Sequence, residues 1–188
     1  MNRFPVCPFS AEFEVDSEGK RIPDPEFGYK LTAQSLENRD RWRAASLKGR
    51  EPLPTLPSHL RVSPLWPANT LPSLLFGFPL RMHHVFDYAK RRQVKLLDKT
   101  RAEPVYRSIH AIMKVIADLD RRCGADLHYG IPRIDGYDFM ISLYTNLTLS
   151  KDQLEAVEER DVIDILMREL QLSEPPMWYW DASFIENS

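Results

Sequence analysis

The chain has 188 residues, of which 43% are hydrophobic and 28% are charged, and its formal net charge is −2. This composition predicts one folded domain, because intrinsically disordered chains hold few apolar residues and carry a large net charge. The balanced charge argues against a wholly basic nucleic-acid-binding protein. The 2 cysteines are too few for a disulfide framework or a four-cysteine metal site.

Neither the amino terminus nor the uncharged stretch at residues 62–80 predicts export or membrane insertion. The first residues lack a continuous apolar run and a small-residue cleavage site, so we expect no secretory signal. Four prolines interrupt residues 62–80 and would break a spanning helix. We therefore expect an intracellular protein with free thiols and no membrane partner. A cytoplasmic location is favoured, and a nuclear one is the alternative.

Residues 1–80 contain eleven of the 15 prolines together with many large apolar side chains. Because proline fixes φ and lacks an N–H donor, long regular elements are not expected here. We predict an extended segment that belongs to the same domain and wraps around it, with residues 62–80 as an apolar connector. Two regular pieces are predicted within it. One is a strand at residues 9–15, and the other is a helix at residues 33–47 with Thr32 as its N-cap.

Three main helices are predicted in the remainder of the chain. The first spans Leu80 to Lys99 and has one apolar side. The second spans Pro104 to Arg122, because proline suits the first position of a helix and a narrow apolar stripe follows. The third begins at Ser150, which is spaced for a capping box, and it ends before Pro175-Pro176.

Residues 127–143 predict a β-hairpin, because apolar residues alternate on both sides of an Asp-Gly pair. A three-residue loop ending at Gly136 would pair Tyr129 with Ile141 and place both apolar sets on one face. A two-residue turn would place them on opposite faces. Pro132 cannot donate a ladder hydrogen bond, so its strand is expected at an edge or with a bulge.

These elements predict an α+β fold in a single domain. A small antiparallel sheet based on the hairpin packs against the three main helices. Residues 1–80 form the proline-rich wrapping segment, and residues 81–188 form a helix–helix–hairpin–helix core with an aromatic tail.

The segment from Arg81 to Arg101 is basic, with seven Lys or Arg residues against two Asp, a local charge of +5. Several of its side chains fall on the polar side of the predicted helix, namely His84, Tyr88, Arg91, Lys95 and Lys99. A basic stripe with stacking planes is typical of nucleic-acid binding. The alternatives are a plain solvated face, or pairing with residues 151–188, where three Lys or Arg face ten Asp or Glu, a local charge of −7.

The tail carries three consecutive aromatic residues, Trp178, Tyr179 and Trp180. If they are exposed, they form an anchor for another protein, because Trp and Tyr dominate interface energetics. If they are packed, they fasten the tail to the domain. We favour packing, because exposed aromatic clusters promote aggregation.

The histidines give only weak indications of chemistry. His84, His128 and Asp138 could form an acid–base pocket, but only if the fold brings them together. No metal-ligand spacing is met, so neither a metal nor another cofactor is predicted. Cys123 continues the apolar stripe of the second helix and is expected in the core.

The leading hypothesis is a non-enzymatic intracellular protein that binds another protein. Its predicted contact residues are the aromatic tail together with Tyr88, Arg91 and Lys95. The sequence contains no glycine-rich phosphate loop and no HExxH, CxxC or GxSxG motif. An alternative is a small cofactor-independent enzyme or small-molecule binder with a histidine and carboxylate pocket. A second and less favoured alternative is nucleic-acid binding through the basic helix at residues 81–101.

Overall fold

The structure is a computed structural model that describes residues 12–24, 29–97 and 104–183. The regular elements are, in chain order, α1 (Ala33–Leu47), the short 3-10 helices η1 (Ser58–Leu60) and η2 (Ala68–Thr70), β1 (Leu74–Leu80), α2 (Met82–Arg92), α3 (Pro104–Cys123), β2 (His128–Gly130), β3 (Phe139–Thr145), α4 (Leu149–Asp152), α5 (Ala156–Leu170) and β4 (Met177–Trp180).

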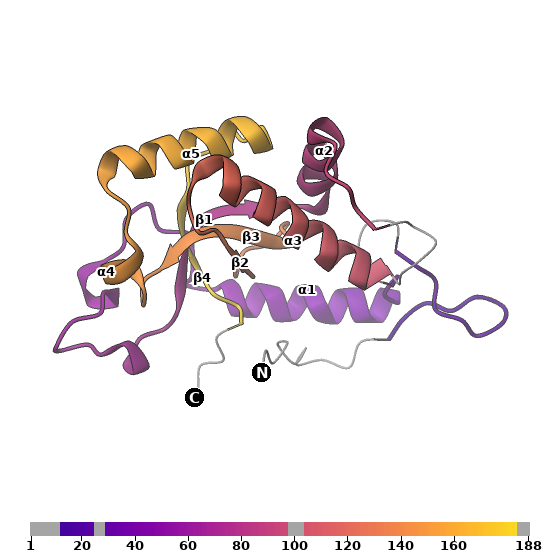
Figure 1. Ribbon diagram of the computed structural model, residues 1–188. Helices are drawn as coiled ribbons and strands as arrows, with labels where there is room; N and C mark the ends of the chain where they lie inside the picture. Colours follow the sequence, from indigo (N-terminus) through magenta and orange to yellow (C-terminus); the bar gives the residue numbers. More distant parts are fainter. Residues whose placement is uncertain (1–11, 25–28, 98–103, 184–188) are drawn as a thin grey trace.

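The four strands form one antiparallel sheet in the order β2-β3-β1-β4. Helices α2, α3 and α5 gather on one side of the sheet (Figure 1). The main core lies between these helices and the sheet, and it includes Phe78 of β1, Ile112 of α3, Ile141 of β3 and Leu166 of α5. The predicted α+β fold, with a small antiparallel sheet against three main helices, is therefore confirmed.

The pairing of β1 with β3 contains a bulge. The register shifts beside Gly77 and leaves Leu143 of β3 as the extra residue. A Cβ atom at Gly77 would lie 2.1 Å from the backbone oxygen of Ile141, so only glycine fits there. The extra residue also resets the alternation of β3, since Leu143 and Tyr144, although adjacent in sequence, both belong to the main core.

The second face of the sheet is covered by the chain that follows β2. Gly130 ends that strand, and the backbone N–H of Arg133 then donates to the carbonyl oxygen of Trp180 at 2.7 Å. A small second apolar cluster lies on this face and consists of Leu75, Met140 and Tyr179 with Ile134 and Met177 packed against it. As a result, β1 is buried on both of its faces.

Several predicted features are confirmed. Helix α1 spans Ala33–Leu47 as predicted, and the Thr32 side chain accepts a hydrogen bond from the Ser35 N–H at 3.2 Å. Tyr129 pairs with Ile141, the predicted register, and β2 is an edge strand. The connection is longer than the predicted three-residue loop, because the pairing of β2 stops before Pro132.

Residues 74–80 are a central strand, so the predicted connector at 62–80 is wrong for its last seven residues. A strand buried on both faces has a continuous apolar run instead of an alternating one. Pro79 is tolerated in β1 because the pairing with β4 ends at Gly77, so no partner strand needs its missing N–H. The wrapping of the preceding residues around the domain stays a prediction.

Two predicted helices have different bounds. The helix predicted from Leu80 to Lys99 is α2, which starts at Met82 because Leu80 is the last residue of β1. It ends at Arg92, because Gln93 adopts a left-handed conformation with φ 55°. The third is divided into α4 and α5, so Ser150 lies inside α4 and caps neither helix.

The predicted strand at residues 9–15 does not join the sheet. Its residues 9–11 lie outside the described residues, and Phe13 and Val15 form only isolated bridges with Leu31 and Arg21.

We expect Gly77→Ala to lower the free energy of unfolding by at least about 3 kcal/mol, because the new methyl group meets backbone atoms that cannot move independently. Gly19→Ala is the control. Its φ is +78° and no atom lies within 4 Å, so only the backbone strain of about 1 kcal/mol remains. Urea denaturation measures both losses, and equal losses would contradict a role for the close approach at Gly77.

Candidate binding sites

The aromatic tail is packed, as the sequence favoured. Trp178 and Tyr179 are 6% and 5% exposed within β4, and the Trp178 ring lies 5.1 Å from the ring of Phe76. Burial raises the pKa of Tyr179 to about 12. Trp178, Tyr179 and Trp180 therefore hold the end of the chain against β1, and they do not form an exposed anchor for a partner.

The predicted basic helix face is largely used inside the molecule. Tyr88 is fully buried, and its hydroxyl donates to Oδ2 of Asp118 at 2.7 Å. The prediction that Tyr88 is an exposed stacking surface is wrong, because α2 packs against both α3 and α5 and so buries more than one side. Arg91 donates to the backbone oxygen of Glu169, and Lys95 is exposed but follows the end of α2.

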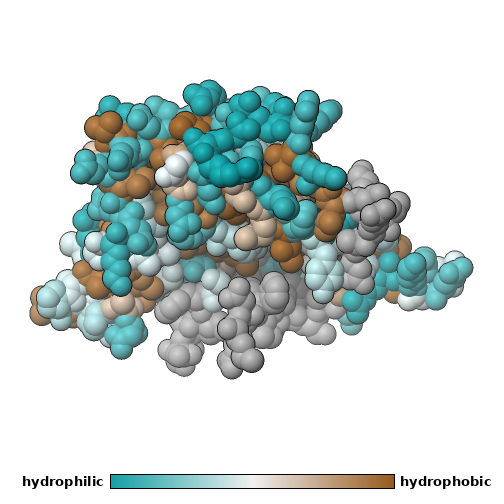
Figure 2. Space-filling model, viewed as in Figure 1, coloured by the Kyte–Doolittle hydropathy of each residue, from teal (hydrophilic) through white to brown (hydrophobic). Residues whose placement is uncertain are grey.

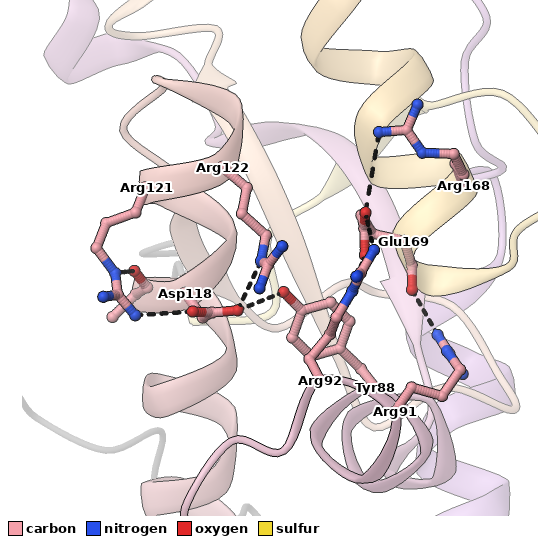
Figure 3. A network of polar contacts seen from close by, with 9 residues as sticks. Tyr88, Arg91, Arg92, Asp118, Arg121, Arg122, Arg168 and Glu169 are labelled. Carbon is pink, nitrogen blue, oxygen red and sulfur yellow. Dashed lines mark hydrogen bonds and ion pairs between the residues drawn. The ribbon is translucent and has the colours of Figure 1, made fainter.

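A network of hydrogen bonds and ion pairs joins the C-terminal ends of α2, α3 and α5 (Figure 3). Arg92 binds Glu169 with two hydrogen bonds of 2.8 and 2.6 Å, and the Glu169 side chain is only 6% exposed. Asp118 accepts hydrogen bonds from Arg121 and Arg122 of its own helix. The Arg92–Glu169 pair agrees with the predicted alternative in which the basic residues 81–101 pair with the acidic residues 151–188.

The carboxylate of Asp118 is stabilised in its charged form. Burial alone would raise its pKa, but the hydrogen bonds from Arg122 and Tyr88 outweigh burial and lower it below the usual value. Burial followed by the hydrogen bond to Asp118 raises the pKa of Tyr88, so this phenol stays protonated and keeps donating. The network therefore binds three helices together.

We expect Glu169→Ala to destabilise the protein by about 1.5–3 kcal/mol, because it removes the two charge-assisted hydrogen bonds between the buried carboxylate and the half-exposed Arg92. Glu37→Ala is the matched control, since its pair with Arg41 is exposed on α1 and should be worth less than about 0.5 kcal/mol. Both losses are measured by urea denaturation. Equal losses would show that the network does not stabilise the fold.

The lowered pKa of Asp118 predicts a pH dependence of stability. The ionised carboxylate stabilises the fold above the ordinary aspartate pKa of 3.8, and this contribution is lost as the pH falls through the lower pKa of the folded state. Asp118→Asn should lower stability near neutral pH and flatten the loss of stability below that value. Asp40→Asn, at an exposed aspartate, is the control. An unchanged acid profile in Asp118→Asn would contradict the assignment.

The fold brings together two of the three candidate catalytic residues. Nδ1 of His84 accepts a hydrogen bond from the Arg81 N–H at 3.1 Å, and Oδ2 of Asp138 accepts one from the Met82 N–H at 2.9 Å. Both side chains thus cap the start of α2. His128 of β2 pairs with Ser142 of β3, and Ser142 lies four residues after Asp138 in the chain. His128 is therefore roughly 13 Å from Asp138. The described residues contain no group of three or more potential metal ligands.

A cleft of about 280 Å³ lies beside the start of α2. It is lined by Phe78, Pro79, Arg81, His83, His84, Tyr137, Gln171, Leu172, Ser173, Glu174, Pro175 and Tyr179. The rings of His83 and His84 lie 4.0 Å apart. Burial, followed by the charge of His83, lowers the pKa of His84, so its ring is neutral near pH 7.

The geometry of this cleft is suited to binding. The hydrogen bonds that His84 and Asp138 form with the backbone of α2 hold these groups at the helix start instead of joining them as an acid–base pair. Cys123 packs against the main core at the far end of α3, and burial raises its pKa to about 11, so it is a poor nucleophile.

The sequence analysis missed one exposed apolar feature, the turn Ser63–Trp66. Its side chains of Leu65 and Trp66 are 85% and 50% exposed. Figure 2 shows apolar atoms at the lower left edge of the molecule, where this part of the chain projects in Figure 1. The sequence does indicate a turn at this position, because a serine and two prolines surround the Leu-Trp pair.

Comparison with protein-family models, curated proteins and solved structures gives no match. Within the described residues, every helix is too short or too polar to cross a bilayer.

Proposed function

We propose that the protein is a non-enzymatic interaction protein that binds a protein partner through the turn Ser63–Trp66. The observation that supports this proposal is the exposure of Leu65 and Trp66 side by side at the tip of a turn. The aromatic-anchor hypothesis is kept, but the anchor is Trp66 instead of the buried tail. The cytoplasmic location expected from the sequence is part of this proposal.

The turn has a defined shape before any partner binds. The backbone groups of Ser63 and Trp66 hydrogen-bond reciprocally at 3.0 Å, and the Trp66 N–H also approaches the Ser63 hydroxyl oxygen at 3.2 Å. Pro64 and Pro67 fix two further φ angles. Such preorganisation lowers the entropy cost of association, so little of the contact energy is lost in ordering the turn.

The chemistry of the turn fits an apolar pocket on a protein. Burial of a Leu or Trp side chain contributes about 1.5–3 kcal/mol, and Trp is a frequent hot-spot residue. A membrane surface is a poorer match. Arg61 is the only Lys or Arg between residues 52 and 80, whereas peripheral membrane segments need several basic residues near the insertion point.

The other two hypotheses have less support as the main function. Nucleic-acid binding through the basic helix has less support, because Tyr88 is buried and Arg92 is paired with Glu169. The small-molecule hypothesis has a specific observation in its favour, the cleft beside the start of α2.

The test uses cross-linking in cells with a photoreactive residue placed next to the turn, at position 62. Wild type is compared with a Leu65→Asp/Trp66→Ser double variant. Val157→Asp is the matched control, because Val157 is an apolar residue of α5 that is 73% exposed. We expect wild type and the Val157 variant to give the same discrete cross-linked protein, and the double variant to lose it.

Circular dichroism and thermal unfolding should show that both variants keep the fold, since all the changed side chains are exposed. Cross-linked products that are identical in wild type and in the double variant would contradict the proposal. Co-flotation of wild type with lipid vesicles, lost in the double variant, would also contradict it and would assign the turn to a membrane.

A further inference from the structure

We propose that the cleft beside the start of α2 is a binding site for a small aromatic carboxylate. The cleft is independent of the turn Ser63–Trp66 and draws its walls from four places in the chain. These are the end of β1, the start of α2, the loop before β3, and the α5–β4 connection with β4.

One end of the cleft is cationic. Nε of Arg81 donates to the carbonyl oxygen of Gly136 at 2.6 Å, and its guanidinium lies 5.8 Å from the ring centre of Tyr137. These two contacts orient the guanidinium, while its two Nη nitrogens form no hydrogen bond with the described residues. An oriented guanidinium recognises a carboxylate well, because two parallel N–H donors match its two oxygens.

A second donor lies beside it. Nδ1 of His84 lies 3.1 Å from the Arg81 N and 3.2 Å from the Arg81 carbonyl oxygen, so it contacts the Arg81 backbone in either tautomer. In the tautomer in which Nδ1 accepts from the Arg81 N–H, Nε2 carries the proton and can donate to a ligand. The site then combines one positive charge with an uncharged donor.

The remaining lining includes the apolar residues Pro79, Leu172 and Pro175 and the aromatic residue Tyr137, which can contact a flat ring. Phe78 and Tyr179 also border the cleft, but their side chains are buried in the two apolar clusters. A volume of about 280 Å³ is at the low end for ligand pockets, which limits the ligand to roughly a single ring with its substituent.

Charge balance distinguishes a carboxylate from a phosphate. The carboxylate and guanidinium groups that line the cleft are one of each, Glu174 and Arg81. A dianion would be attracted by one cation and repelled by Glu174, whereas a monoanion bound at Arg81 needs only the guanidinium.

The test is titration of the full chain with three probes near neutral pH, followed by NMR chemical shifts and calorimetry. Benzoate supplies the ring and the carboxylate, benzamide supplies the ring without the charge, and inorganic phosphate supplies the charge without the ring. We expect benzoate to shift the signals of Arg81, His84 and Tyr137, benzamide to bind at least about tenfold more weakly, and phosphate to cause no shifts there.

Arg81→Gln should weaken benzoate binding by at least about tenfold. Arg61→Gln is the matched control, because Arg61 is also an exposed arginine whose Nε contacts a backbone oxygen, that of Leu56. Two further variants test the site if Arg81→Gln disturbs the loop at Gly136. Arg81→Lys keeps the positive charge but not the paired donors, and His84→Phe keeps a ring but removes the N–H donor. Each should weaken benzoate binding more than benzamide binding.

Three results would overturn the proposal. Benzoate and benzamide could bind equally, benzoate could cause no shift of the cleft residues at millimolar concentration, or Arg81→Gln could bind benzoate as wild type does. None of these results bears on the turn Ser63–Trp66, so the two proposals fail or succeed separately.

Discussion

The two-sided pairing of β1 is the constraint on which the rest of the structure depends. This strand hydrogen-bonds to β3 along one edge and to β4 along the other, and it is covered on both faces. Unpaired backbone groups at such a buried position would each cost about 1–3 kcal/mol, so both neighbours are required. The bulge at Gly77 lets β3 fit closely on one side and directs Leu143 and Tyr144 into the same core.

This pairing also determines which groups remain for function. Because β1 takes up the tail as β4, the aromatic residues that look most suited to a partner are inside the molecule. The same pairing sets Tyr179 beside the end of β1 and the start of α2, where the cleft forms. The ion-pair network uses Arg92 and Glu169 to hold α2 against α5. The turn Ser63–Trp66 stays outside this packing and exposes its two large apolar side chains.

The sequence predicts those elements whose signals are local. The Thr32 cap, Pro104 at the start of α3 and the alternation that sets Tyr129 opposite Ile141 depend on neighbouring residues, and all three are confirmed. Residues 74–80 could not be recognised, because a strand buried on both faces lacks alternation and Pro79 suggests a loop. The placement of Tyr88 and of the cleft depends on contacts between segments far apart in the chain, which periodicity does not reveal.

Hydrogen exchange of the β4 backbone amides tests the central pairing most directly. The backbone N–H of Trp178 donates to Leu53, so the N–H of the next residue, Tyr179, faces β1, where Tyr179 pairs with Leu75. The two-sided pairing predicts that the amide of Tyr179 exchanges only through global unfolding, with the same protection as those of β3, while the amide of Leu65 exchanges rapidly. Exchange of the Tyr179 amide at the rate of Leu65, with β3 still protected, would show that the tail does not pair with β1 and would contradict this account.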